Sequence, residues 1–242
     1  MTKADRVLLL WDVDHTLIDS GGVSKINYAR AFELLVGRPP AVPARTGGRT
    51  DVLIMSTLLA ENGISEATFS VNAQLSALAR AGATNRTLLG ERGRALPGAH
   101  EALHVLQSAP DIIQSVLTGN IQANAFVKLD TFGLADALDF SVGAFGHESS
   151  RRADLVPVAQ RKAEERYAFV PVSEATVILG DTTRDVEAGL QGGAQVIGVA
   201  TGGVSVVDLR SAGAVAAIED LRDLEGLIRG IEDARSRGAV NP

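Results

Sequence analysis

Short apolar runs alternate along this chain with longer amphipathic stretches, and that rhythm constrains the fold more than any other feature. The runs that we predict as strands are Val7–Trp11, Ile113–Leu117, Phe140–Val142, Thr176–Leu179, Val196–Val199 and Val215–Ile218. The stretches with helical periodicity between them are His100–Gln107, Ala123–Phe132, Val156–Arg166 and Thr183–Gln191. Strands that are apolar on both faces and are joined through helices are typical of a parallel sheet covered on each side. The chain is therefore predicted to be an α/β protein.

The stretch from Asp19 to Arg94 interrupts that rhythm. It has no convincing strand, and its helical patterns lie at Lys25–Leu35, Asp51–Asn62 and Ala67–Ala81. Glycines at both of its ends suit hinges. We therefore predict an α/β core made of residues 1–18 and 95–242, and an all-helical domain of residues 19–94 that can close over the tip of the first strand. The alternative is that these helices pack on the sheet within one domain.

Composition narrows the class of partner. The 242 residues are 45% hydrophobic, enough for a sizeable core, and the net charge of −6 argues against the phosphate backbone of a nucleic acid as the main partner. The chain has no cysteine, which excludes disulfides and thiolate metal sites and fits a reducing compartment. The first apolar run is too short for a signal peptide or a membrane span. We expect a cytoplasmic, soluble protein with no membrane partner, and the sequence does not indicate its oligomeric state.

Polar side chains stand where three of the predicted strands end. Asp12 and Asp14 follow the first run, Thr118 follows Ile113–Leu117, and Asp181 comes after Thr176–Leu179. The carboxyl ends of parallel strands meet at one edge of a sheet, where ligands of such proteins bind. Carboxylates gathered there repel one another, so their presence together indicates that a cation or a reaction requires them. The convergence predicts a binding or catalytic crevice at this edge.

With these segments in view, the chain resembles the haloacid dehalogenase (HAD) superfamily, in its phosphoglycolate phosphatase-like branch with a helical cap inserted after the first strand. The segments that match the four motifs of the family, in order, are Asp12–Leu17, Leu117–Asn120, Arg152–Pro157 and Gly180–Asp185. Four motifs in order at fitting spacings are a strong signal, whereas one alone is weak. The resemblance covers essentially the whole chain and implies a Rossmann-like core with an all-helical cap domain.

The resemblance implies a Mg2+-dependent phosphatase that acts on a small phosphorylated metabolite, such as a sugar phosphate or phosphoglycolate. In that reaction Asp12 attacks phosphorus and becomes an aspartyl phosphate, and Asp14 serves as general acid and then general base. The family pattern assigns Mg2+ to the Asp12 side chain, the Asp14 main-chain carbonyl and Asp181, with Asp185 nearby or acting through water. The alternative for Asp185 is charge placement at a helix N-terminus.

The same resemblance assigns the phosphate group to the second and third motifs. Thr118 would donate its hydroxyl, with help from the backbone amides around Gly119 and Asn120. Arg152 would hold the phosphate and the nucleophile, and the neighbouring Arg151 is the alternative for this cation.

Two positions depart from the family pattern. His15 stands where Gly is usual, either as a tolerated turn residue or as a border of the substrate site. Arg stands in place of the commoner Lys of the third motif, and the two side chains are not equivalent. If Arg152 is misaligned, Lys128 could supply the positive charge, although its position otherwise suggests a surface residue of its helix.

Substrate choice is expected to lie in the helical insert. Its loop Ala44–Asp51 contains two arginines, Arg45 and Arg49, and the family pattern turns this loop toward the core. We expect Arg49, and then Arg45, to contact part of the substrate beyond the phosphate. The alternative is that both are solvated.

Three other functions stay open at this point. A phosphomutase uses the same Asp pair but excludes water from the intermediate. A haloacid dehalogenase needs neither the metal nor a second carboxylate at the position of Asp14. A non-catalytic binding protein of the same fold would have no need for the acidic residues at positions 12, 14 and 181.

Overall fold

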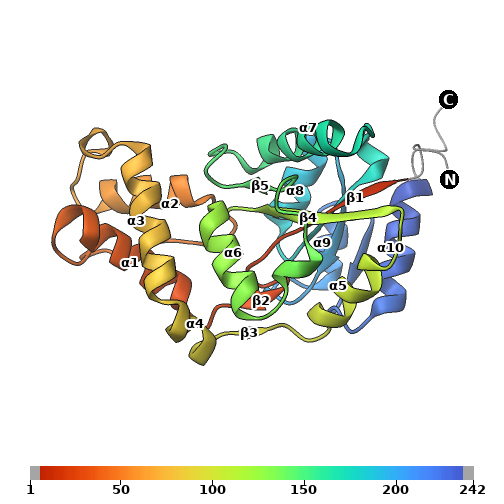
Figure 1. The fold of residues 1–242 in the computed structure, drawn as a ribbon, viewed down its shortest axis with the longest axis horizontal. Helices are drawn as coiled ribbons and strands as arrows, with labels where there is room; N and C mark the ends of the chain where they lie inside the picture. The colour runs from red at the N-terminus through yellow and green to blue at the C-terminus, as the bar shows by residue number, and fades with distance from the viewer. Residues whose placement is uncertain (1–5, 237–242) are drawn as a thin grey trace.

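The centre of the protein is a parallel β-sheet. The computed structural model describes residues 6–236, and within that range the sheet has six strands in the order β5-β4-β1-β6-β7-β8 (Figure 1). The strands are β1 (Val7–Trp11), β4 (Ile112–Thr118), β5 (Ala144–Phe145), β6 (Thr176–Gly180), β7 (Gln195–Val199) and β8 (Ala216–Ile218). The first strand therefore lies at the centre of the sheet, between β4 and β6.

Helices cover both faces of the sheet because successive side chains of each strand point to opposite sides. In β1, Val7, Leu9 and Trp11 belong to one buried cluster, while Leu8 and Leu10 belong to the other. The first cluster is covered by α5 (Ala99–Gln107), α6 (Gln122–Thr131) and α10 (Leu224–Ser236). The second is covered by α7 (Leu155–Tyr167), α8 (Thr183–Gly192) and α9 (Val206–Ser211). The predicted α/β class, with helices on both faces of a parallel sheet, is confirmed.

The predicted elements differ from the structure in a few places. The strand predicted at Phe140–Val142 is wrong, because the edge strand β5 is Ala144–Phe145. The Asp139 carboxylate accepts hydrogen bonds from the Ser141 amide and hydroxyl, and this local turn competes with strand formation. The helices α9 and α10 were not predicted, nor was α4 (Arg86–Arg92).

The segment 19–94 is helical. Its helices are α1 (Val23–Val36), α2 (Asp51–Glu61), α3 (Val71–Thr84) and α4, and a separate buried cluster includes Phe32, Met55 and Leu78. In Figure 1 these helices lie to one side of the sheet, with α6 next to them. At the two crossings, β2 (Ile18–Asp19) pairs antiparallel with β3 (Arg94–Ala95). We call residues 19–94 the cap segment; its status as a separate domain stays a prediction.

The cap segment touches the core at the turn that follows β4. The Asp51 amide donates to the Gly119 carbonyl at 2.7 Å, and the Ile121 amide donates to the Asp51 carboxylate at 2.8 Å. A Cβ atom built on Gly119 would lie 2.3 Å from the carbonyl oxygen of Arg49. Glycine at position 119 therefore lets the two backbones approach each other.

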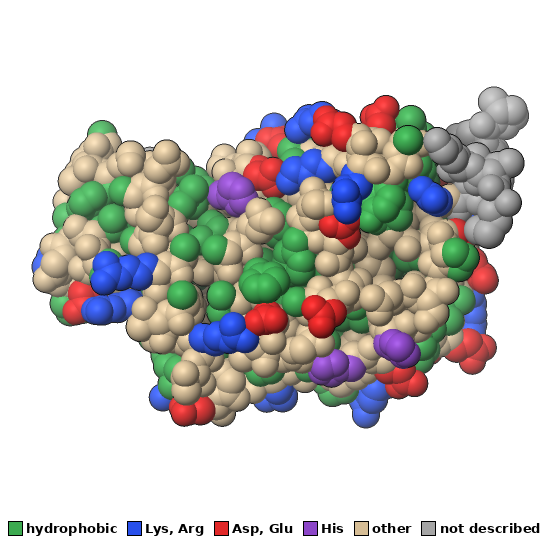
Figure 2. All heavy atoms as spheres, viewed as in Figure 1, with side chains coloured by type: hydrophobic (Ala, Val, Ile, Leu, Met, Phe, Trp, Pro, Cys, Tyr) green, Lys and Arg blue, Asp and Glu red, His purple; other side chains and the backbone are tan. Residues whose placement is uncertain are grey.

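The surface carries charges of both signs. On the face drawn in Figure 2, acidic and basic side chains are interspersed, and apolar side chains gather near the centre. Phe126 of α6 is among the exposed apolar residues. Within residues 6–236, we found no helix whose length and apolar character would let it cross a bilayer.

We predict that Gly119→Ala destabilises the protein by about 1–3 kcal/mol, because the added methyl group overlaps the Arg49 carbonyl and forces backbone to move. Urea or thermal unfolding measures the change. The control is Gly90→Ala on α4, where the nearest atom to an added Cβ is a Thr131 methyl carbon at 3.7 Å. Helix propensity should make that variant stable or slightly more stable. Equal unfolding free energies for wild type and Gly119→Ala would contradict the close approach.

Candidate active site

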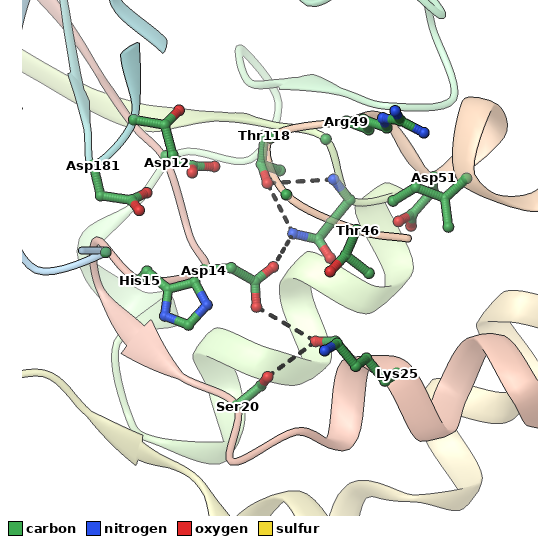
Figure 3. Close-up of a pocket in the computed structure, with 18 of the residues that line it drawn as sticks. Asp12, Asp14, His15, Ser20, Lys25, Thr46, Arg49, Asp51, Thr118 and Asp181 are labelled. Carbon is green, nitrogen blue, oxygen red and sulfur yellow. Dashed lines mark hydrogen bonds between the residues drawn. The ribbon is translucent and has the colours of Figure 1, made fainter. Parts of the chain in front are cut away.

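Three central strands deliver polar residues to one cavity. Trp11 of β1 is in register with Val116 of β4 and with Leu179 of β6, so the residues just beyond these pairs lie side by side. The Asp12 amide donates to the Leu179 carbonyl at 2.9 Å, which continues the ladder by one residue. Asp12, Thr118 and Asp181 then line a cavity of about 390 Å³ between the sheet edge and the cap segment (Figure 3).

The carboxylates of Asp12, Asp181 and Asp185 form a buried acidic cluster. One oxygen of each lies within 4.8 Å of the others, and Figure 3 shows the Asp12 and Asp181 side chains on the same side of the cavity. Burial, offset only in part by Arg152, raises the pKa of Asp12 to about 6. Burial and the neighbouring carboxylates raise the pKa of Asp181 to about 8. The cluster therefore carries more negative charge than its surroundings neutralise.

Arg152 is the cation within this cluster. Its Nη2 lies 2.9 Å from Asp12 Oδ1 and 2.6 Å from Asp185 Oδ1, and its side chain is only 9% exposed. Burial disfavours the guanidinium charge, yet the two carboxylates hold the pKa of Arg152 above its ordinary value. Its Nε is buried and has no hydrogen-bond acceptor within residues 6–236. Arg151 is exposed and lies 3.9 Å from Asp154, so Arg152 is the member of the pair that reaches Asp12.

Asp185 also lies in the first turn of α8, which begins at Thr183. Its Oδ2 accepts from the Thr182 amide at 2.9 Å and from the Thr182 hydroxyl at 2.7 Å, and the Thr182 hydroxyl in turn accepts from the Asp185 amide. This reciprocal pair is a capping box at the N-terminus of α8. Asp185 Oδ2 therefore has Thr182 as its donor, whereas Oδ1 pairs by charge with Arg152 at 2.6 Å and makes no hydrogen bond within residues 6–236.

Asp14 lies on the other side of the cavity and points away from Asp12 and Asp181 (Figure 3). Lys128 Nζ lies 2.8 and 2.6 Å from its two oxygens, and Asn120 Nδ2 donates to it at 2.8 Å. Burial disfavours the charge, but the Lys128 ammonium lowers the pKa of Asp14 below its ordinary value. The expectation that Lys128 is a surface residue is wrong, because it is buried on α6 and bonds to Asp14 and Asn120.

The turn after β4 presents hydrogen-bond donors. Thr118 Oγ1 accepts from the Asn120 side-chain amide at 2.9 Å and from the Asn120 backbone amide at 3.3 Å. Both of these bonds use the Thr118 oxygen as acceptor, so neither of them uses its hydroxyl hydrogen. Gly119 and Asn120 also line the cavity.

The backbone conformation at His15 is one that glycine adopts more easily than other residues. Its φ of 61° lies in the left-handed region, which residues other than glycine rarely adopt. The turn is held by the His15 amide, which donates to the Ile18 carbonyl at 2.7 Å, and by the Thr201 hydroxyl, which donates to the His15 carbonyl. The side chain is exposed and borders the cavity.

The two candidate arginines of the cap segment differ in position. Arg49 is among the residues that line the cavity, although Figure 3 draws its guanidinium on the far side of Thr118 from Asp12. Arg45 is not among them; its Nε lies 3.4 Å from Glu61, and its side chain is 69% exposed.

Sequence reasoning missed several residues of the site. Buried Asp51 accepts from the Tyr28 hydroxyl and from the Ile121 amide. Burial raises the pKa of both Asp51 and Tyr28. Thr16 and Ser24 contact Asp181 and Asp14, each at 3.4 Å. The one sequence signal for Lys128 was its helical spacing from the buried residues of α6, whereas nothing local in the sequence pairs Tyr28 with Asp51.

Chemically, the site combines the buried carboxylate of Asp12 with a second carboxylate, that of Asp14, across the cavity. It also has hydrogen-bond donors for an anion and an acidic cluster with the oxygen ligands that hard divalent cations prefer. Such a set suits hydrolytic or group-transfer chemistry on an anionic substrate.

Comparison with solved structures shows the same fold. A HAD hydrolase of family IA, variant 3, from Entamoeba histolytica HM-1:IMSS is 20% identical, with a TM-score of 0.65, and the match covers 94% of this chain and 99% of that one. A predicted phosphoglycolate phosphatase from Haemophilus somnus 129PT is 16% identical, with a TM-score of 0.60 and coverage of 94% and 99%. A putative beta-phosphoglucomutase from Thermotoga maritima is 21% identical, with a TM-score of 0.55 and coverage of 97% and 100%.

Among curated proteins, no relative matches this chain. The family model for haloacid dehalogenase-like hydrolases, however, matches residues 9–189, which include Asp12, Thr118, Arg152 and Asp181. On this match, over most of its length, the chain belongs to the haloacid dehalogenase-like hydrolase family.

Proposed function

We propose that this protein is a Mg2+-dependent phosphatase that hydrolyses a small phosphate monoester through phosphorylated Asp12. The observation that carries the proposal is the burial of Asp12 and Asp181 together, beside Arg152 and the donors of the Thr118 turn. A phosphate monoester resists attack because its oxygens are negative, so a site must neutralise them and align the nucleophile.

Asp12 is the proposed nucleophile. Arg152 holds one of its oxygens at 2.9 Å, which fixes the carboxylate at the tip of β1. Attack by the Asp12 oxygen on phosphorus breaks the bond to the alcohol oxygen and leaves an aspartyl phosphate. Water then attacks phosphorus, which releases inorganic phosphate and restores the carboxylate.

Asp14 is the proposed acid and base. It would give a proton to the departing alcohol oxygen and then take one from the attacking water. Its side chain is within the same cavity but lies apart from Asp12. That separation suits a group that acts on the leaving oxygen and not on phosphorus.

The phosphate oxygens would be held by donors on this chain. The hydroxyl hydrogen of Thr118, the backbone amides around Gly119 and Asn120, and the buried Nε of Arg152 are the candidates. Charged donors bind phosphate more strongly than neutral ones, so Arg152 is expected to contribute most.

The residues present fit a divalent cation. Asp12 and Asp181 bring carboxylate oxygens close together, the oxygen ligands that Mg2+ prefers, and their raised pKa values reflect excess negative charge. We propose that these side chains hold Mg2+ with the Asp14 main-chain carbonyl. Asp185, whose oxygens face Arg152 and Thr182, would act from nearby or through water. When bound, Mg2+ supplies positive charge against the phosphate oxygens.

The substrate is proposed to be a small cytoplasmic metabolite. A cavity of about 390 Å³ admits a molecule of that size. The cap segment closes one side of the cavity through Thr46, Gly48 and Arg49, and substrate selection is assigned to that side. Release of inorganic phosphate from a simple ester would separate this function from a phosphomutase, which returns the phosphoryl group to substrate.

Asp12→Asn is predicted to lower kcat by more than about 1,000-fold, because the amide cannot attack phosphorus. Phosphate release from an aryl phosphate measures the loss, and circular dichroism checks that the fold is kept. The matched control is Asp233→Asn on the exposed side of α10, which should keep wild-type kinetics. Substantial activity in Asp12→Asn would mean that the nucleophile is misassigned.

The metal-free protein is predicted to lose stability as the pH rises from about 4 to about 8. The unfolded chain has ordinary Asp pKa values near 3.9, whereas the folded-state pKa values of Asp12 and Asp181 are about 6 and about 8. The native state therefore binds more protons across this range, and its stability falls as these protons are lost.

Mg2+ should reverse that loss. At a concentration about 100 times its Kd, the linkage of binding to folding corresponds to a rise in Tm of about 5–10 °C. The rise should be larger near pH 8, where both carboxyls are closer to full ionisation, than near pH 5. Scanning calorimetry with and without Mg2+ measures it, and Asp181→Asn should show a smaller rise. A Tm that does not change on addition of Mg2+ at either pH would count against the metal site.

Arg49→Ala is predicted to reduce kcat/KM about ten-fold or more for esters that carry a second polar or anionic group, through loss of a charged hydrogen bond. A simple aryl phosphate should be affected much less. A panel of phosphate esters, assayed with wild type and variant, measures the difference. Arg45→Ala is the matched control, because Arg45 does not line the cavity. An unchanged order of preference in Arg49→Ala would remove Arg49 from substrate recognition.

A further inference from the structure

The lysine of α6 is buried where sequence alone suggested an exposed one. In α6, Asn124, Ala125, Lys128 and Leu129 share the buried face, and the Lys128 side chain is only 5% exposed. Lysine is almost never buried to this degree unless its charge is paired. Arg152 is already the cation beside Asp12 at the C-terminal end of β1. Lys128 pairs with a different carboxylate, that of Asp14.

All three ammonium hydrogens of Lys128 have acceptors. Nζ lies 2.8 Å from Asp14 Oδ1, 2.6 Å from Asp14 Oδ2 and 2.7 Å from Asn120 Oδ1. An ammonium group has three donors and no acceptor, so these three contacts use its full capacity. Lys128 therefore grips both oxygens of Asp14 and the carbonyl end of the Asn120 side chain.

The contact with Asn120 fixes which way its amide faces. Because Asn120 Oδ1 meets the ammonium, Nδ2 must point the other way, where it donates to Asp14 at 2.8 Å and to Thr118 Oγ1 at 2.9 Å. A reversed amide would set its own hydrogens against the ammonium. The lysine thus orients one side chain that touches both Asp14 and Thr118.

We propose that Lys128 is a positioning residue that holds Asp14 in place for proton transfer and, through Asn120, couples it to the Thr118 hydroxyl that receives the phosphate. The inference rests on the phosphatase reaction proposed above and deepens it. Lys128 touches neither Asp12 nor the proposed metal ligand Asp181, and acts through its neighbours.

A purely structural role would give a different result. If Lys128 only neutralises the partly buried carboxylate of Asp14, its loss lowers stability and affects all substrates alike. If it positions Asp14, its loss falls on the step that needs a proton. The alkoxide of an alkyl phosphate is a poor leaving group that needs a proton as it departs. The nitrophenolate of nitrophenyl phosphate departs without one.

The test is Lys128→Met, which keeps the length and removes the charge. We expect kcat/KM for an alkyl phosphate to fall about 100-fold and that for nitrophenyl phosphate to fall less than about ten-fold. Any change in KM that comes through Asn120 and Thr118 should be the same for the two esters, because both carry the same phosphate group. The Mg2+ concentration for half-maximal activity should change by less than about three-fold, because Lys128 contacts neither Asp12 nor Asp181. The matched control is Lys162→Met, whose ammonium lies 2.8 Å from Glu148 and 2.7 Å from the Gly143 carbonyl. That variant should affect both esters equally and little.

Rescue provides a second readout. The chain has no cysteine, so Lys128→Cys introduces the only thiol. Attack of this thiolate on 2-bromoethylamine displaces bromide and forms a thioether whose ammonium is as many atoms from the backbone as in lysine. The treated variant should regain most of its activity on the alkyl ester, whereas treatment with iodoacetamide, which adds no charge, should not restore it.

Crystal structures of wild type and Lys128→Met test the inference without turnover. We expect the Asp14 carboxylate and the Asn120 side chain to move in the variant. If both stay in place, or if kcat/KM falls in equal proportion for the two esters, Lys128 does not position Asp14. If wild type hydrolyses no phosphate ester with Mg2+, the proposed function fails, and the crystal structures alone then decide whether Lys128 orients Asp14.

Discussion

Mutual repulsion among buried carboxylates is the constraint on which the rest of this structure depends. Asp12 and Asp181 stand at the tips of adjacent central strands because β1 pairs with β6 in register, and both residues are largely buried. Arg152 contributes one positive charge against them and Asp185, which leaves an excess of negative charge. A fold that keeps such an arrangement bears a cost in stability, and that cost makes sense where a cation and a phosphate are to be bound.

The second carboxylate of the first motif is held differently. Asp14 is only two residues from Asp12, yet it faces the cap segment and is surrounded by donors from Lys128, Asn120 and Ser24. The result is two carboxyl groups whose environments shift their pKa values in opposite directions, upward for Asp12 and downward for Asp14. A cation bound beside Asp12 would lower its pKa and favour the carboxylate that attacks phosphorus, whereas Lys128 favours the carboxylate form of Asp14, the form that takes a proton from water.

The cap segment contacts the core at the turn that follows β4, which includes Gly119 and Asn120. Asp51 bonds to Gly119 and Ile121 on either side of Asn120, and Arg184 of α8 donates to the Gly47 carbonyl. A movement of the turn after β4 would therefore displace the cap segment through these hydrogen bonds. This links the proposed phosphate-binding turn to the proposed substrate-selecting loop.

Much of the fold and part of the site could be predicted from sequence. The α/β class followed from strands that are apolar on both faces, and Asp12, Thr118 and Asp181 followed from their places at strand ends. Those signals are local. The edge strand β5 was misplaced because the bonds within the Asp139–Ser141 turn favour a bend there.

The partners of Lys128 and Asp51 could not be predicted in the same way. The ammonium of Lys128 meets Asp14 across 114 positions of sequence, and Asp51 meets Ile121 across 70. No local pattern encodes these pairings, which arise only when α6 packs beside the cap helices. The missed helix α10, by contrast, had a visible signal in the spacing of Leu227, Ile231 and Ala234 on one face.

The most direct measurement is anomalous diffraction from crystals soaked in Mn2+, which shares the preference of Mg2+ for carboxylate oxygens. A site built from Asp12 and Asp181 predicts one strong peak within bonding distance of both carboxylates. A peak elsewhere, or none at saturating Mn2+, would contradict the claim that these residues gather around a divalent cation.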